Sequence, residues 1–259
     1  FNNSSDYSGS TLLLGAIFFT FQIYGDFSGY SDIALGTARL FGIDLLRNFA
    51  FPYFSRDIAE FWRRWHISLS SWFRDYLYFP LGGSRGGTWM KVRNTFIIFI
   101  VSGFWHGANW TFIVWGALNA LYFLPLLLTN SNRINLETVA QGKLLPSVKE
   151  FSLMMITFCL TIFAWIFFRA NNLGHAVSYI SEIFSNSLLT IPEVFPMTTI
   201  LLIVFFLLVE WVGREGQYAL SQILIKRKRA YRWAFYIMLI LVTFYTGNFK
   251  ENVFIYFQF

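Results

Sequence analysis

Seven apolar segments, separated by polar stretches, divide the chain. They fall at residues 11–24, 33–43, 95–105, 111–128, 151–168, 198–212 and 233–246. Several are shorter than the roughly 20 residues of a full membrane span. Such segments must be tilted, broken, or sheltered by neighbouring helices rather than by lipid. The pattern therefore predicts an all-α polytopic membrane protein, a bundle of tilted and broken transmembrane helices.

Residues 25–32, with the sequence GDFSGYSD, place Asp26 and Asp32 directly between two of these apolar segments. A helix that faces lipid would not tolerate the two carboxylates, because charge in hydrocarbon is costly. We expect this piece to line a protein interior or a wet cavity. Asp32 is therefore a candidate substrate-binding residue.

A stripe of apolar and aromatic side chains recurs at helical spacing between residues 55 and 77. Ser55 is the expected N-cap, His66 lies on the apolar side of this helix, and Glu60 and Arg64 lie largely off the stripe. A basic helix with a Trp-rich face predicts a cytoplasmic amphipathic helix that lies in the membrane interface or packs against the bundle. The stripe comprises Ile58, Phe61, Trp62, Trp65, Leu69, Trp72, Phe73 and Tyr76.

Composition agrees with a membrane protein, since hydrophobic residues make up 56% of the chain and charged residues 13%. A soluble domain carries about twice that fraction of charge. The net charge of +6 indicates loop topology rather than nucleic-acid binding, because the basic residues lie between apolar runs. The chain has one cysteine, Cys159, which excludes a disulfide within the chain. It has no HExxH motif, and we expect no metal site.

The distribution of Lys and Arg predicts the orientation. Residues 47–93 carry eight and residues 214–232 carry six, whereas residues 2–10 carry none and residues 169–197 carry one. By the positive-inside rule, the first two loops are cytoplasmic and the last two external, in a multi-pass protein of the inner cell membrane. This requires residues 95–128 to turn back as two broken segments; a single steep span is the alternative.

His106, in the sequence Trp105-His106-Gly107, is the main candidate for chemistry. It lies in the stretch 95–128, which contains no Lys, Arg, Asp or Glu. Helix geometry places it about 20 Å beyond Arg93, past the middle of a ~30 Å hydrocarbon core for an upright helix. An imidazole there is unfavourable unless it is used or hydrogen-bonded. We interpret His106 as functional. The alternative is a structural histidine whose ring is hydrogen-bonded to a neighbouring carbonyl.

Five stretches resemble the membrane-bound O-acyltransferase family, in particular the bacterial branch of alginate O-acetyltransferases and the D-alanyl transfer proteins of teichoic acid. The resemblance implies that His106 is the catalytic histidine and His66 the second motif residue. It also implies that residues 1–259 are the C-terminal portion of one domain whose N-terminal helices are missing. The stretches are FQIYGDFSGYSDIALGTARLFGI (21–43), RNFAFPYFSRDIAEFWRRWHISLSSWFRDYLYFPLGG (47–83), SGFWHGANWTFIVWG (102–116), AWIFFRA (164–170) and FIYFQF (254–259).

The resemblance further implies an O-acyltransferase, with acetyl as the preferred group. The donor is a cytoplasmic thioester, acetyl-CoA or an acyl carrier, and no cofactor is tightly bound. The expected partners are membrane lipid, this donor, and an external glycan reached directly or through an extracytoplasmic acetyltransferase. Many relatives continue WGxxHG where this chain has WGALNA, which argues against a catalytic role for Asn119.

A neutral imidazole can take the proton of a hydroxyl as it attacks a thioester. By proximity, Asn109 and the Trp105 indole N–H are candidate oxyanion donors. Arg64 and His66 would suit orientation of the donor thioester or its phosphates. Two other classes remain open: a transporter or channel with a polar path through Asp26, Asp32 and His106, and a scaffold.

Overall fold

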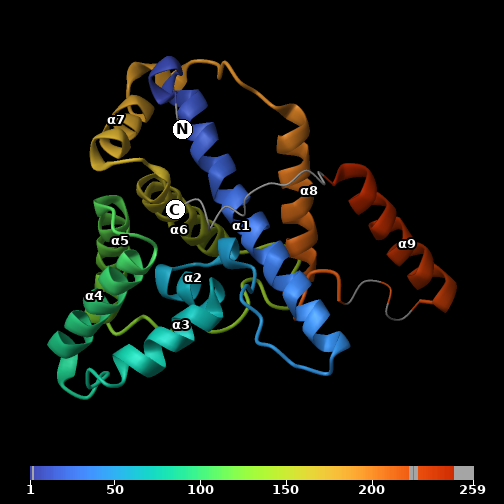
Figure 1. Cartoon of the computed structure of the whole chain (residues 1–259), viewed down its shortest axis with the longest axis horizontal. Coiled ribbons are helices and arrows are strands. Elements are labelled where there is room, and N and C mark those ends of the chain that lie inside the picture. Colours follow the sequence, from blue (N-terminus) through green and yellow to red (C-terminus); the bar gives the residue numbers. More distant parts are fainter. Residues whose placement is uncertain (2, 222–223, 225–226, 248–259) are drawn as a thin grey trace.

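The computed structural model describes residues 1, 3–221, 224 and 227–247, and these form helices and connecting loops without a strand (Figure 1). Three helices are long and apolar enough to cross a membrane: α1 (Gly9–Leu40), α5 (Trp110–Leu128) and α6 (Val148–Arg169). The all-α prediction is confirmed, and the FIYFQF stretch lies outside the described residues. The other elements are η1 (Ser4–Asp6), η2 (Pro52–Phe54), α2 (Ile58–Arg64), α3 (Ile67–Phe73), the π-helical turn η3 (Arg74–Tyr78), α4 (Gly87–Trp105), α7 (Leu173–Ile183), η4 (Asn186–Leu189), α8 (Met197–Gly213) and α9 (Arg229–Thr246).

Helix α1 is continuous over 32 residues and includes the polar sequence 25–32. The two apolar segments expected at 11–24 and 33–43 are therefore one helix. A glycine costs a helix only about 1 kcal/mol, which is less than the loss of a whole hydrogen-bonded turn. The N-terminal half of α1 is buried at Ile23, whereas Asp32 lies on an exposed part of the helix.

The single amphipathic helix expected over 55–77 is instead two short helices and a π-helical turn. Helix α2 ends at Arg64 and α3 begins at Ile67, after His66, which adopts a left-handed backbone with φ of 44°. The expected N-cap Ser55 is wrong: Asp57 caps α2 by accepting a hydrogen bond from the Glu60 backbone N–H. The first part of the Trp-rich face packs into the bundle, since Trp65 is 1% exposed, whereas Trp72 of α3 is 47% exposed.

Helices α4 and α5 form an antiparallel hairpin, which confirms that residues 95–128 turn back on themselves. The two helices are in backbone contact at two glycines. A Cβ on Gly103 would lie 2.3 Å from the Phe112 carbonyl oxygen, and one on Gly116 would lie 2.2 Å from the Phe99 carbonyl oxygen. Any side chain at these positions would force the helices apart.

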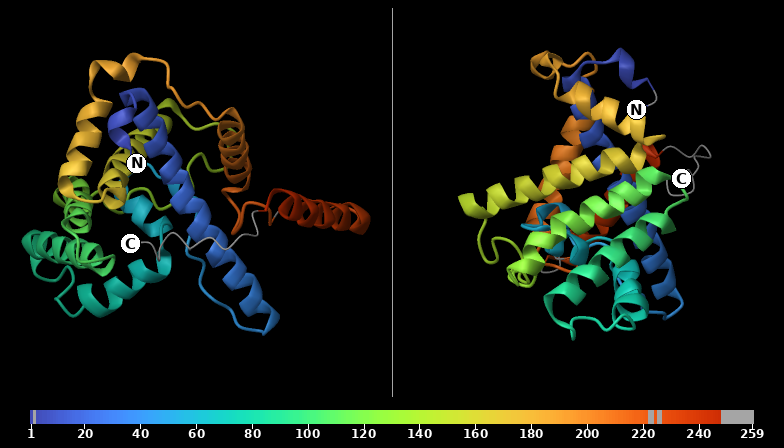
Figure 2. Two further views of the ribbon diagram at one scale, coloured as in Figure 1. Left: turned by 45° about the horizontal axis from the view of Figure 1, so that its top comes forward. Right: turned by 90° about the vertical axis from the view of Figure 1, so that its left-hand side faces the viewer.

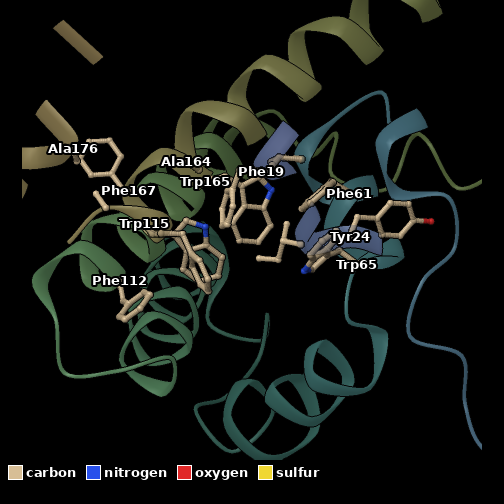
Figure 3. Packing of buried hydrophobic residues seen from close by; sticks show 14 of the residues in the cluster. Phe19, Tyr24, Phe61, Trp65, Phe112, Trp115, Ala164, Trp165, Phe167 and Ala176 are labelled. Atoms are coloured by element: carbon tan, nitrogen blue, oxygen red, sulfur yellow. The ribbon is translucent and has the colours of Figure 1, made fainter. Parts of the chain in front are cut away.

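The main core is an aromatic cluster shared by α1, α2, α5 and α6 (Figure 3). Trp115 of α5 stacks on Trp165 of α6, with centroids 5.7 Å apart, and Trp165 contacts Trp65 at 5.3 Å. Helices α5 and α6 run side by side, and α9 projects away from the bundle (Figure 2). This cluster fixes the two histidine-bearing junctions relative to each other.

The loops sort to the two ends of the bundle according to charge. The Ser8 hydroxyl donates to Glu193 at 2.7 Å, which joins the two segments poor in Lys and Arg. At the other end, Arg47 donates to the Gln217 carbonyl at 2.8 Å and Arg214 to the Val139 carbonyl at 3.0 Å. The loops expected to be cytoplasmic thus share one end.

Candidate functional site

His106 is the first residue after α4 and opens the turn into α5. Its backbone N–H donates to the Gly103 carbonyl at 3.1 Å. Gly107 follows with φ of +149°, and a Cβ there would lie 2.8 Å from Cε2 of Phe112. The turn therefore needs glycine at 107 both for its backbone and for the close approach of the Phe112 ring.

Aromatic rings from two helices surround the His106 imidazole. Trp115 lies edge-on at 5.3 Å between centroids, Phe168 of α6 at 5.0 Å, and Phe112 at 6.3 Å. This apolar environment disfavours the charged imidazolium relative to the neutral imidazole, which is the form that can accept a proton. Sequence reasoning did not single out these rings, although Trp115 and Phe168 lie in the quoted stretches.

His66 lies at the break between α2 and α3, outside the three candidate spans. Its ring meets Phe27 of α1 edge-on, with centroids 4.7 Å apart. Burial lowers the pKa of His66 to about 4, and the charge of His106 acts in the same direction. The two imidazoles, forty positions apart in the sequence, are thus close enough to interact electrostatically.

Asn48 and Ala50 hold the backbone on the two sides of His66. Asn48 contacts the residues that follow it. Its carbonyl accepts from Ile67 N–H at 3.0 Å, and its side-chain oxygen accepts from the Ser68 hydroxyl at 2.6 Å. The Arg64 carbonyl accepts from Ala50 N–H at 2.9 Å. Together these bonds stabilise a conformation that a non-glycine residue seldom adopts. The sequence analysis missed Asn48, which lies within the matched stretch 47–83.

Arg64 belongs to a buried charge network rather than to an exposed polar face. Glu60, expected off the packed stripe, is 1% exposed and lies between two arginines. Its carboxylate contacts Arg64 at 2.8 Å and Arg56 at 3.0 Å. Arg64 also donates to the Ala50 carbonyl at 3.0 Å. The Arg64 guanidinium, which was expected to orient the donor, is therefore already bound to Glu60 and to the Ala50 carbonyl.

The remaining candidates lie in different surroundings. Asn109 caps α5 by accepting from Thr111 N–H at 3.1 Å, and it donates to the Asn171 carbonyl at 2.9 Å. Trp105 is 65% exposed, so its indole is not enclosed beside His106. Asp32 lies on α1 beyond Phe27 and interacts electrostatically with Glu210. The structure groups the two histidines, while these side chains lie at the margins.

Asn119 is buried one turn beyond Trp115. Its side-chain N–H donates to the Trp115 carbonyl at 2.8 Å, and its side-chain oxygen accepts from the Trp62 indole N–H at 3.2 Å. Both contacts are to other residues of the bundle, and the expectation that position 119 has no catalytic role stays a prediction. They hold the Trp62 ring against Trp115, with centroids 5.7 Å apart.

Comparison with known proteins places this arrangement in a family. The family model described as MBOAT, membrane-bound O-acyltransferase family, matches residues 5–167. A protein named probable alginate O-acetylase from Pseudomonas aeruginosa is 45% identical over 172 residues, which are 66% of this chain and 31% of that protein. The peptidoglycan O-acetyltransferase of Helicobacter pylori is 40% identical over 177 residues, 68% of this chain and 32% of the relative.

A more distant relative is the teichoic acid D-alanyltransferase of Bacillus subtilis, 34% identical over 110 residues, or 40% of this chain and 28% of that protein. The matched part amounts to about a third of the length of the two O-acetyltransferase relatives.

Proposed function

Because the chain belongs to the membrane-bound O-acyltransferase family, we propose that it carries the catalytic histidines of an enzyme that acylates a hydroxyl at the membrane. Acetyl is the preferred group, since the relatives named alginate O-acetylase and peptidoglycan O-acetyltransferase match more of the chain than the D-alanyltransferases do. Family membership disfavours the transporter and scaffold alternatives. The observation that supports the site is the pairing of His106 and His66 in an aromatic interior.

The proposed reaction uses the neutral imidazole of His106 as general base. It takes the proton of the acceptor hydroxyl as the oxygen attacks the thioester carbonyl carbon. A tetrahedral intermediate forms and collapses as the carbon–sulfur bond breaks. The thiolate leaves and takes the proton back from the imidazolium, so the histidine ends neutral. The Phe112, Trp115 and Phe168 rings exclude water that would otherwise hydrolyse the thioester.

The second histidine is proposed to position the donor rather than to act as a second base. His66 lies on the α2–α3 junction, close to His106. This junction is at the end of the bundle where the basic loops gather. A thioester entering from the cytoplasm would meet this junction first. The proposed donor is acetyl-CoA or an acyl carrier, and the proposed acceptor is an external glycan or a relay protein. The proposed location is the inner membrane, with several spans.

The test is the acetyl content of surface glycans in cells that carry the complete protein. His106→Ala and His106→Gln should insert normally yet lose transfer by about 10²- to 10⁴-fold, since neither side chain can accept the proton. The matched control is His175→Gln, which changes a histidine that bonds Ser4 at the other end of α1. Wild-type product ester in a His106 variant would remove the assignment. Loss of D-alanine instead of acetyl would change only the acyl group.

A further inference from the structure

A second site lies between the α2–α3 layer and the α4–α5 hairpin. It is a cavity of about 510 Å³ that neither His66 nor His106 lines. Trp62 separates it from the reaction site, because this ring lines the cavity and also packs on Trp115, which contacts His106. The proposed acyl transfer therefore does not account for this cavity.

Three arginines, Arg63, Arg74 and Arg133, are among the residues that line the cavity. Arg63 is held in place by hydrogen bonds to the carbonyls of Asn132 at 2.8 Å and Asn135 at 2.7 Å. Arg74 already pairs with Asp75 at 2.7 Å. Within the described part of the chain, no carboxylate forms a salt bridge with Arg63 or Arg133.

Arg63 and Arg133 are close enough to repel each other. Burial lowers the pKa of Arg63, Asp57 and Glu60 oppose this effect, and Arg64 and then Arg133 add to it. Two neighbouring cations without an ion-pair partner favour an anion between them. A phosphate group, with several acceptor oxygens, suits two guanidinium groups better than a single carboxylate does.

The rest of the lining is apolar and extends along the hairpin. Phe73, Ile98, Phe99, Phe123 and Leu127 supply most of it. From Thr95 to Ser102 the lining follows α4 for about 10 Å at ~1.5 Å per residue. A free phosphate would leave this space unused, whereas a fatty acyl chain would fill it with favourable apolar contact.

We propose that this cavity binds an anionic membrane phospholipid, with its phosphate between Arg63 and Arg133 and one acyl chain along α4 and α5. The polar and apolar parts of the cavity follow the expected depth in the membrane. The arginines lie at the end of the hairpin that also carries Lys91 and Arg93. The apolar lining runs from there toward the turn at His106. A lipid would place its headgroup at the interface and its chain toward the bilayer centre. The proposal is independent of the acyl-transfer chemistry.

The test uses the complete protein purified in detergent and native mass spectrometry with added dioleoyl phosphatidylglycerol or dioleoyl phosphatidylcholine. The wild type should retain phosphatidylglycerol preferentially, and Arg63→Gln with Arg133→Gln should reduce this preference about tenfold or more. The charge-conserving pair Arg63→Lys with Arg133→Lys should keep part of it. Ile98→Trp should reduce retention by filling the apolar part.

The matched control is Arg39→Gln, because Arg39 lies on α1 at the same end of the bundle and outside the cavity. Elution volume and melting temperature identify variants that fail to fold. If the double glutamine variant fails to fold, the Arg63→Lys with Arg133→Lys variant is compared with the wild type instead. An unchanged preference in the double glutamine variant would overturn the proposal. So would displacement of the lipid by acetyl-CoA, which would make the cavity a donor site, or equal protection by inorganic phosphate alone.

Discussion

The imidazole of His106 meets the indole of Trp115 edge-on, with ring centroids 5.3 Å apart and planes at 90°. Phe168 approaches the same imidazole at 5.0 Å and Trp115 at 5.2 Å. Aromatic side chains from two helices, Trp115 of α5 and Phe168 of α6, therefore determine both the position of the proposed base and its dry environment. The first prediction follows from this contact.

Replacing Phe168 by Leu should lower acyl transfer about 2- to 10-fold with little change in insertion. The substitution keeps most of the apolar volume but removes ring contacts worth about 0.5–1.5 kcal/mol. Initial rates with a defined thioester would measure the effect. The control is Phe163→Leu, a partly buried ring on the same helix that packs on Phe167 at 5.8 Å. Equal losses in both variants would show that the His106 contact has no special role.

Replacing Gly103 or Gly116 by Ala should destabilise the protein by about 1–3 kcal/mol, since the new methyl group meets a backbone carbonyl that cannot move away. Thermal unfolding in detergent would report this. Gly29→Ala is the control, because nothing lies within 4 Å of its Cβ position and α1 gains helix propensity there. If the three variants melt alike, α4 and α5 are not in backbone contact.

Replacing His66 by Gly should abolish its contribution to transfer while leaving the melting temperature above that of His66→Ala. Glycine adopts the left-handed backbone at 66 without strain, whereas alanine adds about 1 kcal/mol. The comparison distinguishes the effect of losing the imidazole from the effect of straining the backbone between α2 and α3. Full activity in His66→Gly would show that only the break matters, and the proposed positioning role would then be lost.

Acid should destabilise the fold. Between pH 6.5 and 4, the unfolded chain binds a proton at His66 that the folded chain does not bind. Stability is therefore complete above pH 6.5 and falls as the pH decreases through that window. The variant His66→Gln should lose this part of the dependence, measured as melting temperature against pH.

Single cysteines at Asn3 and Asn186 should react with an impermeant maleimide from outside the cell, and cysteines at Arg85 and Lys228 only after permeabilisation. Cys159 is first replaced by Ser. The reason is the charge difference between the two ends of the bundle. External labelling at position 85 would reverse the orientation and place the basic loops outside.

The sequence by itself determined the helical class, because apolar periodicity is a local property. The distribution of Lys and Arg favoured a turn within 95–128 over a single span, an imidazole within an uncharged stretch singled out His106, and the family resemblance added His66. Only the tertiary structure showed that α1 is continuous, that Asp57 rather than Ser55 caps α2, and that the predicted amphipathic helix breaks at His66. Helix propensity is weak compared with packing, so Trp65 in the core and Asn48 on the neighbouring backbone decide that break.

The same reason explains Glu60 and the aromatic rings around His106. Periodicity assigned Glu60 to a polar face, but two arginines from neighbouring turns pair with its carboxylate and make its burial possible. Phe112 and Trp115 meet His106 because α5 turns back along α4, and Phe168 meets it because α6 packs beside α5. Contacts between residues dozens of positions apart depend on helix packing, which no local pattern records.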